Sequence, residues 1–170
     1  MIELLPVKPY RENFHGGCGP ASLKMVLDYY GIKKLEKEIF KLCKTRKDTG
    51  TPAENIKKAA ESFGLKVKIK DNSSFKDIEY WLGRKVPVIV DWFTRGRIDY
   101  DESEVADGHY SVVAGLDKKY IYLQDPELGG LRKIKKEDFM IVWFDFKGKY
   151  IRKDELVIRQ IIAIYRQNMV

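Results

Sequence analysis

The chain has 170 residues, of which 44% are hydrophobic and 12% aromatic, so it can bury a core without disulfide or metal support. The formal net charge of +7 comes from lysines scattered among glutamates, a pattern typical of a solvated basic surface and not of a nucleic-acid site. Two cysteines and two histidines without a CxxC pair exclude a disulfide framework and a zinc cage, and no apolar run reaches the ~18 residues of a membrane span.

The first half of the chain is predicted to be mainly helical. Apolar residues recur at helical spacing from Leu23 to Tyr30, and Gly31 ends this pattern. Thr51-Pro52-Ala53-Glu54 has the form of a capping box with proline at the first helical position. We expect helices over residues 19–30, 34–44, 51–64 and 74–83.

Strands are predicted to dominate the second half. Alternating or continuous apolar residues indicate strands over residues 66–70, 86–93, 109–116, 120–125, 131–134 and 158–166. We expect a helical turn over residues 137–143, between the last two of these strands, and a long acidic loop over residues 94–107. Helices followed by antiparallel strands indicate an α+β fold in which N-terminal helices pack on a C-terminal antiparallel sheet.

Cys18 lies in a glycine-rich run directly before the first expected helix. Gly16 and Gly17 allow a tight backbone and keep bulk away from the sulfur, and Pro20 fits a first helical turn. The free N–H groups and partial positive charge of a helix N-terminus favour a thiolate, which is the attacking species. We therefore interpret Cys18 as a nucleophile and Cys43, in a lysine-rich helix, as structural.

Two histidines are candidates for the base. His15 is three residues before Cys18, in a loop, whereas His109 follows Gly108 and opens an apolar strand that would hold its ring rigidly. The nearby acids and the cysteine favour His109.

The acid has three candidates: Asp107, Asp117 and Asp125. Asp117 is typical of turn chemistry, and Asp107 adjoins the base in the long loop. Asp125 ends the strand that follows the base, where it could also open the turn at Asp125-Pro126.

The register of the expected hairpin favours Asp125. A three-residue loop pairs Leu116 with Tyr120 and places Ser111 opposite Asp125, so that His109 is a diagonal neighbour of Asp125 on the same face, ~7–8 Å away at the backbone. A two-residue loop would put Asp125 on the wrong face.

Acyl transfer also needs donors for the oxyanion. The backbone N–H of Cys18 is one, and Asn13 carries the one side-chain amide nearby; Glu12, when ionised, could only accept. We expect the substrate-binding residues to be Gly17, Asp107 and Gly108.

These motifs resemble the papain-like cysteine peptidases that cut bacteriocin leaders after a double glycine. The matching segments are Cys18-Gly19-Pro20-Ala21, Gly108-His109-Tyr110-Ser111-Val112-Val113 and Asp125-Pro126. The stretch from Asp138-Phe139 to Trp143 resembles the phenylalanine and tryptophan that close the family's domain. The resemblance spans about Pro6 to Trp143. It implies the papain-like fold, with Cys18 as nucleophile, His109 as base and Asp125 as orienter.

The chain departs from that family at two points. The family usually has glutamine six residues before the cysteine, as an oxyanion donor, where this chain has Glu12. Either Asn13 replaces that glutamine with a one-residue shift, or activity is weak or lost. The family is also often the N-terminal part of a peptide exporter, and because no transporter segment is present we expect a stand-alone domain over residues 1–170.

The sequence therefore predicts a thiol peptidase that forms a thioacyl-enzyme with a peptide or protein substrate, without cofactor, metal or nucleic acid. Two alternatives remain: a thiol acyltransferase resembling phytochelatin synthase, and an inert peptide-binding domain. The start of the chain lacks a signal-peptide pattern and no apolar run could span a membrane, so we expect a cytoplasmic protein. The resemblance implies a prokaryotic protein and allows a separate transporter as partner.

Overall fold

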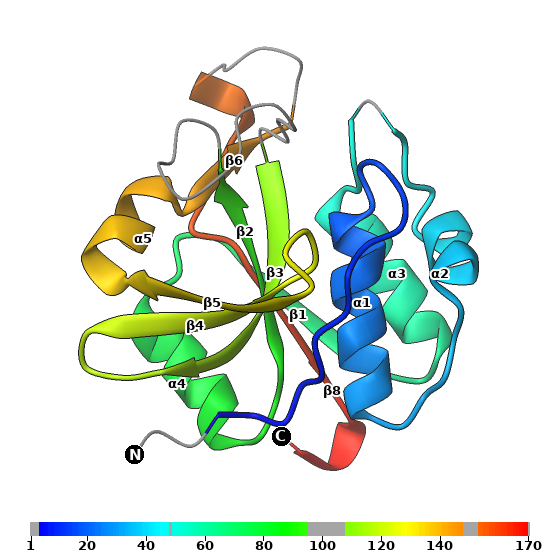
Figure 1. The fold of residues 1–170 in the computed structure, drawn as a ribbon, viewed down its shortest axis with the longest axis horizontal. Coiled ribbons are helices and arrows are strands. Elements are labelled where there is room, and N and C mark those ends of the chain that lie inside the picture. Colours follow the sequence, from blue (N-terminus) through cyan, green and yellow to red (C-terminus); the bar gives the residue numbers. More distant parts are fainter. Residues whose placement is uncertain (1–3, 48, 95–107, 148–152, 170) are drawn as a thin grey trace.

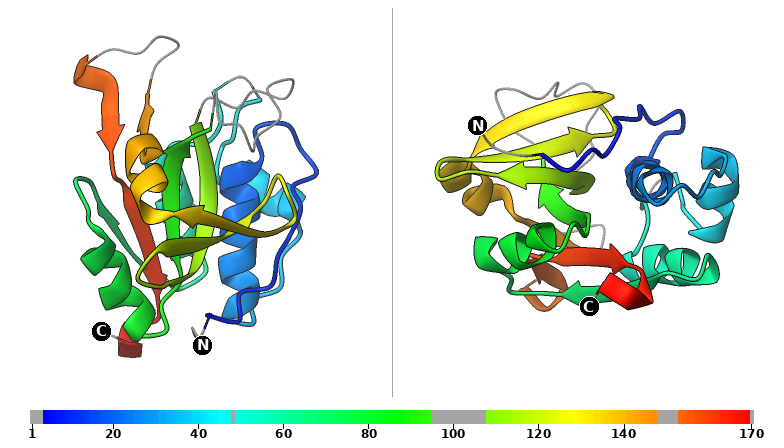
Figure 2. Two further views of the ribbon diagram at one scale, coloured as in Figure 1. Left: turned by 60° about the vertical axis from the view of Figure 1, so that its left-hand side comes forward. Right: turned by 90° about the horizontal axis from the view of Figure 1, so that it is seen from below.

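The computed structural model describes residues 4–47, 49–94, 108–147 and 153–169. Three helices lie together on one side of a sheet in Figure 1: α1 (Cys18–Tyr29), α2 (Glu36–Leu42) and α3 (Ala53–Ser62). Helices α4 (Phe75–Gly83) and α5 (Lys136–Val142) lie on its other side, and two further views in Figure 2 show the same separation. No helix of the described ranges is long and apolar enough to cross a membrane.

The described residues form one six-stranded sheet in which every pair of neighbouring strands is antiparallel. In spatial order its strands are β1 (Lys66–Lys70), β8 (Ile161–Tyr165), β2 (Val88–Phe93), β3 (Gly108–Leu116), β4 (Tyr120–Asp125) and β5 (Gly130–Lys135). The predicted α+β class, with N-terminal helices on an antiparallel sheet, is confirmed.

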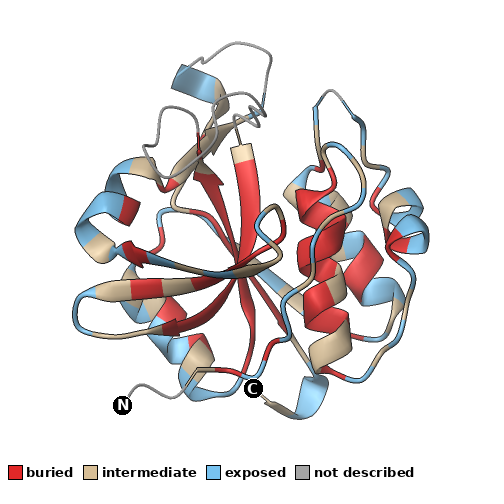
Figure 3. Cartoon of the chain, in the orientation of Figure 1, coloured by how far each residue is buried: buried red, intermediate tan, exposed pale blue. Residues whose placement is uncertain are grey.

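The core lies on both faces of this sheet because the central strands alternate between two apolar clusters. Ile89 and Ile162 pack with the helices α1–α3, whereas Val90 and Ala163 pack with α4 and α5. Figure 3 shows the resulting buried band along α1, β2 and β3. Because packed side chains cover both faces of the sheet, the backbone of α1 and of β3 is rigid where these two elements meet.

The hairpin between β3 and β4 differs from its predicted register near the turn. Leu116 pairs with Ile121, not with Tyr120, so the loop is one residue longer than expected. Ala114 is then bulged, because the pairing shifts between Gly115 and Val113. Beyond the bulge Val112 pairs with Gln124, which is the register that the sequence predicted for this end of the hairpin.

The C-terminal strand expected over residues 158–166 is two strands. Arg159 has a positive φ of 48°, and its N–H donates to the Trp143 carbonyl, so the chain turns there. Before the turn, β7 (Leu156–Ile158) pairs with β6 (Phe144–Phe146) in a small second sheet that the sequence did not predict. Two short 3₁₀ turns, Lys153–Glu155 and Gln167–Met169, flank β7 and β8.

Core packing at β8 can be tested with a pair of isoleucines. Ile162→Ala should lower the free energy of unfolding by about 2–5 kcal/mol, since Ile162 is fully buried against Ile69 and Ile89. Ile141→Ala, at a side chain that is 74% exposed on α5, should change it by less than about 0.5 kcal/mol. Urea unfolding of both variants measures the difference, and equal losses would contradict this description of the core.

Candidate active site

Cys18 is the first residue of α1 and is 7% exposed. The turn before it is tight: the Gly17 N–H donates to the Phe14 carbonyl, and a Cβ on Gly17 would lie 2.5 Å from that oxygen. Glycine is therefore required at position 17 for steric reasons. The Cys18 sulfur lies at the N-terminus of α1.

His109 and Asp125 form the hydrogen bond that the hairpin register predicted. His109 Nε2 lies 2.8 Å from Asp125 Oδ1, and both side chains are buried, with 1% and 0% exposure. The Trp92 ring meets the His109 ring edge to face at 5.6 Å between centroids, which fixes the imidazole plane. Cys18 is also a hydrogen-bond partner of His109, so the three predicted residues meet in one place.

Asp125 is held by two further groups that sequence reasoning missed. The Arg132 Nε–H donates to Asp125 Oδ2 at 2.6 Å, and the Glu127 N–H donates to Oδ1 at 3.0 Å. Arg132 is diagonal to Asp125 across the β4–β5 pair, because Asp125 pairs with Gly130. Strand parity would also have predicted the Arg132–Asp125 contact if the residues of the β4–β5 turn had been known.

The electrostatics of the pair favour an imidazolium beside a carboxylate. Burial alone would lower the pKa of His109, but the Asp125 carboxylate and Cys18 raise it to about 10. Burial would raise the pKa of Asp125, but His109 and Arg132 hold it far below its usual range. These shifts favour an ionised Asp125 beside a protonated His109.

The second histidine and the second cysteine lie apart from this arrangement. His15 is exposed in the loop before Cys18. Cys43 is fully buried, and burial raises the pKa of its thiol to about 12, as for an unreactive core thiol.

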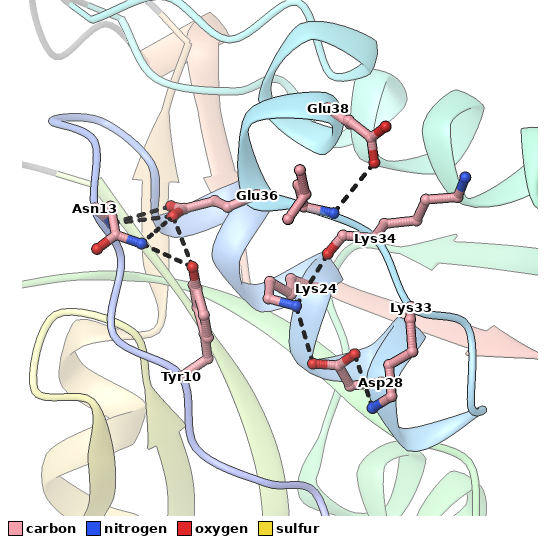
Figure 4. A network of polar contacts seen from close by, with 9 residues as sticks. Tyr10, Asn13, Lys24, Asp28, Lys33, Lys34, Glu36 and Glu38 are labelled. Carbon is pink, nitrogen blue, oxygen red and sulfur yellow. Dashed lines mark hydrogen bonds and ion pairs between the residues drawn. The ribbon is translucent and has the colours of Figure 1, made fainter.

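The Asn13 side chain is engaged by Tyr10 and Glu36, as Figure 4 shows. Its Nδ2 donates to Tyr10 Oη at 2.7 Å and to Glu36 Oε2 at 2.8 Å, while its backbone N–H faces both Glu36 oxygens at 3.2 Å. Glu36 is 4% exposed and anchors this loop to α2. These contacts occupy the amide and do not fit the expected role of Asn13 as an oxyanion donor.

Glu12, expected to act only as an acceptor when ionised, lies next to the His109–Asp125 pair. Its N–H donates to the Pro126 carbonyl at 2.8 Å, which ties it to the turn after Asp125. Burial raises the pKa of Glu12 to about 7, although the nearby His109 opposes this shift. The sequence did not indicate this burial, because Glu12 lies in the polar run Tyr10-Arg11-Glu12-Asn13, which is typical of an exposed loop.

A second acidic group lies behind the site. Asp91 of β2 is 3% exposed, and its side chain bonds to Asp145 and to the Tyr110 hydroxyl. Burial, reinforced by Asp145, raises the pKa of Asp91 well above its usual value, so the pair shares a proton. A Cβ on Gly108 would collide with the Asp145 carboxylate, which explains the glycine before His109.

Within the described residues one group could offer three ligand atoms to a cation: His109, Asp125 and Glu127, whose ligand atoms lie within 4.8 Å of one another. His109 and Asp125 are already bonded to each other, and Arg132 places a positive charge on Asp125. These contacts disfavour a cation, and we assign no metal to them. Apart from Thr94, the long loop expected over residues 94–107 lies outside the described residues, and Asp107 and its other acidic residues lie there with it.

The accessibility and environment of the two thiols predict selective alkylation. Near pH 6, iodoacetamide should label Cys18 much faster than Cys43, because Cys18 lies beside a protonated His109 and Cys43 is buried. Mass spectrometry of tryptic peptides measures both rates, with Cys43→Ala as the control for Cys18 alone. Equal rates at the two cysteines would remove the nucleophile assignment.

The shared proton of Asp91 predicts a pH-dependent stability. The native state holds a proton that the unfolded chain releases above a pKa of about 3.9, so its stabilising effect is lost as the pH rises toward the raised native pKa. Asp91→Asn keeps a donor for Asp145 and cannot ionise. The stability of the variant relative to wild type should therefore increase as the pH rises above about 4, as followed by urea unfolding.

The exposed Asp154→Asn serves as the control for Asp91→Asn. Its difference from wild type should stay constant with pH, and a constant difference for Asp91→Asn as well would contradict the shared proton.

Comparison with known proteins identifies the family. A model of the Peptidase C39 family matches residues 7–146. The transport/processing ATP-binding protein ComA of Streptococcus pneumoniae is 33% identical over 128 residues, which are 74% of this chain and 16% of that protein. The chain thus spans 16% of the length of the curated relatives it matches.

Two solved structures share the fold. The peptidase domain of Streptococcus ComA aligns with a TM-score of 0.71 and 23% identity, covering 95% of this chain and 99% of that one. A double glycine motif protease from an AMS/PCAT transporter, in complex with a leader peptide, aligns with a TM-score of 0.67 and 24% identity, covering 96% and 94%. These likenesses confirm the predicted papain-like fold. Since the family model spans most of its length, the chain belongs to the Peptidase C39 family and is a cysteine peptidase, as its sequence predicted.

Proposed function

We propose that this chain cleaves peptide bonds with Cys18 as nucleophile, His109 as general base and acid, and Asp125 as the group that orients His109. The observation that carries this proposal is the buried 2.8 Å bond between His109 Nε2 and Asp125 Oδ1, in a ring that also bonds Cys18. A nucleophile, a base and an orienter in hydrogen-bond contact are what covalent acyl transfer requires.

The reaction proceeds in two balanced halves. The Cys18 sulfur forms a bond to the scissile carbonyl carbon, and the carbonyl π electrons move to its oxygen. The oxyanion returns this electron pair, the C–N bond breaks, and the leaving amine takes the proton of the His109 imidazolium. Water then attacks the thioester while His109 accepts its proton, and breaking of the C–S bond restores the thiolate.

Asp125 and Arg132 keep His109 in the right state for both halves. The Asp125 carboxylate accepts from Nε2, which leaves Nδ1 for the proton that moves between Cys18 and the leaving amine. Arg132 stabilises the ionised form of Asp125, so the carboxylate stays an acceptor throughout. Arg132 is thus a positioning residue that acts through Asp125.

The proposed substrate is a peptide with a double-glycine leader, delivered by a separate transporter. The ComA relative is named a transport/processing protein, and one structural neighbour is a double glycine motif protease bound to a leader peptide. Gly17 and Gly108 adjoin Cys18 and His109 in sequence, and together with Asp107 they are the proposed substrate-binding residues. The free thiols of Cys18 and Cys43 support a reducing, cytoplasmic location, and residues 1–170 are proposed as one peptidase domain.

Exchange of each histidine tests the assignment of the base. His109→Ala should lower the rate of cleavage of a double-glycine peptide by about 10²- to 10⁴-fold, because proton transfer is lost. His15→Ala should retain most of the rate, since His15 is exposed in the preceding loop. Chromatographic assay of cleaved peptide measures both, with Cys18→Ala as the inactive reference.

If His15→Ala is instead the inactivating change, the base is misassigned. Binding of the peptide by wild type without cleavage would favour the inert peptide-binding domain, and transfer of the acyl group to an added thiol or amine in preference to water would favour the acyltransferase.

A further inference from the structure

Glu12 is fixed from both sides in a position that faces the catalytic pair. Its own N–H bonds to the Pro126 carbonyl, and the next N–H, that of Asn13, bonds to the buried Glu36 carboxylate. The loop therefore cannot swing Glu12 away without breaking contacts to both the β4–β5 turn and α2. Among the described residues, Glu12 Oε2 is buried and has no hydrogen-bond partner.

A buried oxygen without a partner is costly unless something fills its place during the reaction. The Glu12 carboxyl interacts electrostatically with His109 and Asp125, so this oxygen lies within the field of the catalytic site. The reaction there creates one negatively charged oxygen, and the Asn13 amide is engaged elsewhere. Glu12 Oε2 is therefore available to the oxyanion; Glu127 Oε2, in the turn after β4, is also buried without a partner.

We propose that Glu12 is the second oxyanion donor, working in its neutral form with an Oε2–H group directed at the developing charge. This proposal rests on the proposed peptidase function. The Glu12 proton is shared in a hydrogen bond and is not transferred: it stays on Oε2 while Cys18 Sγ bonds the carbonyl carbon and while the C–N bond later breaks. A carboxylic acid kept neutral by its surroundings is an effective donor to an oxyanion.

Four charged side chains act on the Glu12 carboxyl: those of Glu127, Glu36, Asp125 and His109. Burial is the largest effect and raises the pKa of Glu12 to about 7, and the negative charges of Glu127 in the β4–β5 turn, Glu36 on α2 and Asp125 at the end of β4 add to it. The charge of His109 on β3 opposes them. Glu12 therefore carries its proton below about pH 7 and loses it above.

This ionisation predicts a fall in the rate on the alkaline side. Above about pH 7 Glu12 becomes a carboxylate, which can only accept a hydrogen bond and repels the oxyanion. The rate constant kcat should then fall by up to about tenfold per pH unit, although His109 stays protonated to about pH 10.

Three variants test the proposal with a double-glycine peptide as the probe. Glu12→Ala should lower kcat about 100-fold or more at pH 6, because one oxyanion donor is lost. Glu12→Gln should restore most of that rate and remove the alkaline fall, because an amide donates at any pH. Glu127→Gln should keep the fall but move its midpoint to lower pH, because the Glu127 charge raises the pKa of Glu12. Glu61→Gln, the same change at an exposed site on α3, should leave the profile unchanged.

Alkylation of Cys18 by iodoacetamide separates a lost donor from a damaged site. This reaction displaces iodide at a saturated carbon and forms no oxyanion, so Glu12→Ala should alkylate at the wild-type rate at pH 6 while cleaving peptide about 100-fold more slowly. A parallel loss of both rates would overturn the donor role, as would an alkaline fall retained in Glu12→Gln. Absence of cleavage by wild type at every pH would instead overturn the proposed function, and the donor role with it.

Discussion

The buried hydrogen bond between His109 and Asp125 is the interaction on which the remaining structure of the site depends. Neither side chain is more than 1% exposed, so their charges are weakly screened and an unpaired member would be strongly destabilising. The bond forms because Asp125 and His109 share one face of the β3–β4 pair. That shared face depends on Ala114: without its bulge, the turn pairing of Leu116 with Ile121 would place Asp125 on the opposite face.

The N-terminal segment, residues 4–17, completes the site from the other side. Leu5 N–H bonds to the carbonyl of the bulged Ala114, and the Val7 carbonyl accepts from the Gln124 side chain, next to Asp125. Further along, Glu12 is bound to Pro126 and Asn13 to Glu36. The segment that leads into Cys18 and α1 is thus attached to the same hairpin that carries His109 and Asp125, as its course in Figure 1 shows. These contacts fix the position of Cys18 relative to His109 and Asp125.

Much of this could be predicted from the sequence because it depends on local patterns. The glycine-rich run before α1 indicated Cys18, and strand parity brought Asp125 to His109 although the turn itself was predicted one residue too short. The features that escaped prediction are non-local. The burial of Glu12 depends on Pro126 and Glu36, which are distant in sequence, and the engagement of Asn13 depends on Glu36 in the same way. Arg132 and the β6–β7 pair required turns that the residue pattern does not specify.

If Cys18 is the nucleophile, it becomes acylated during turnover, and intact-mass spectrometry after rapid acid quench detects the acyl-enzyme. The substrate would be an activated ester of a peptide ending in two glycines, which acylates faster than the thioester hydrolyses. We expect one added peptidyl mass, which fragmentation locates on Cys18. The adduct should be absent in Cys18→Ala and should accumulate little in His109→Ala. Acylation at Cys43 or at a lysine, or hydrolysis of the ester by wild type with no adduct on Cys18, would contradict the assignment of Cys18.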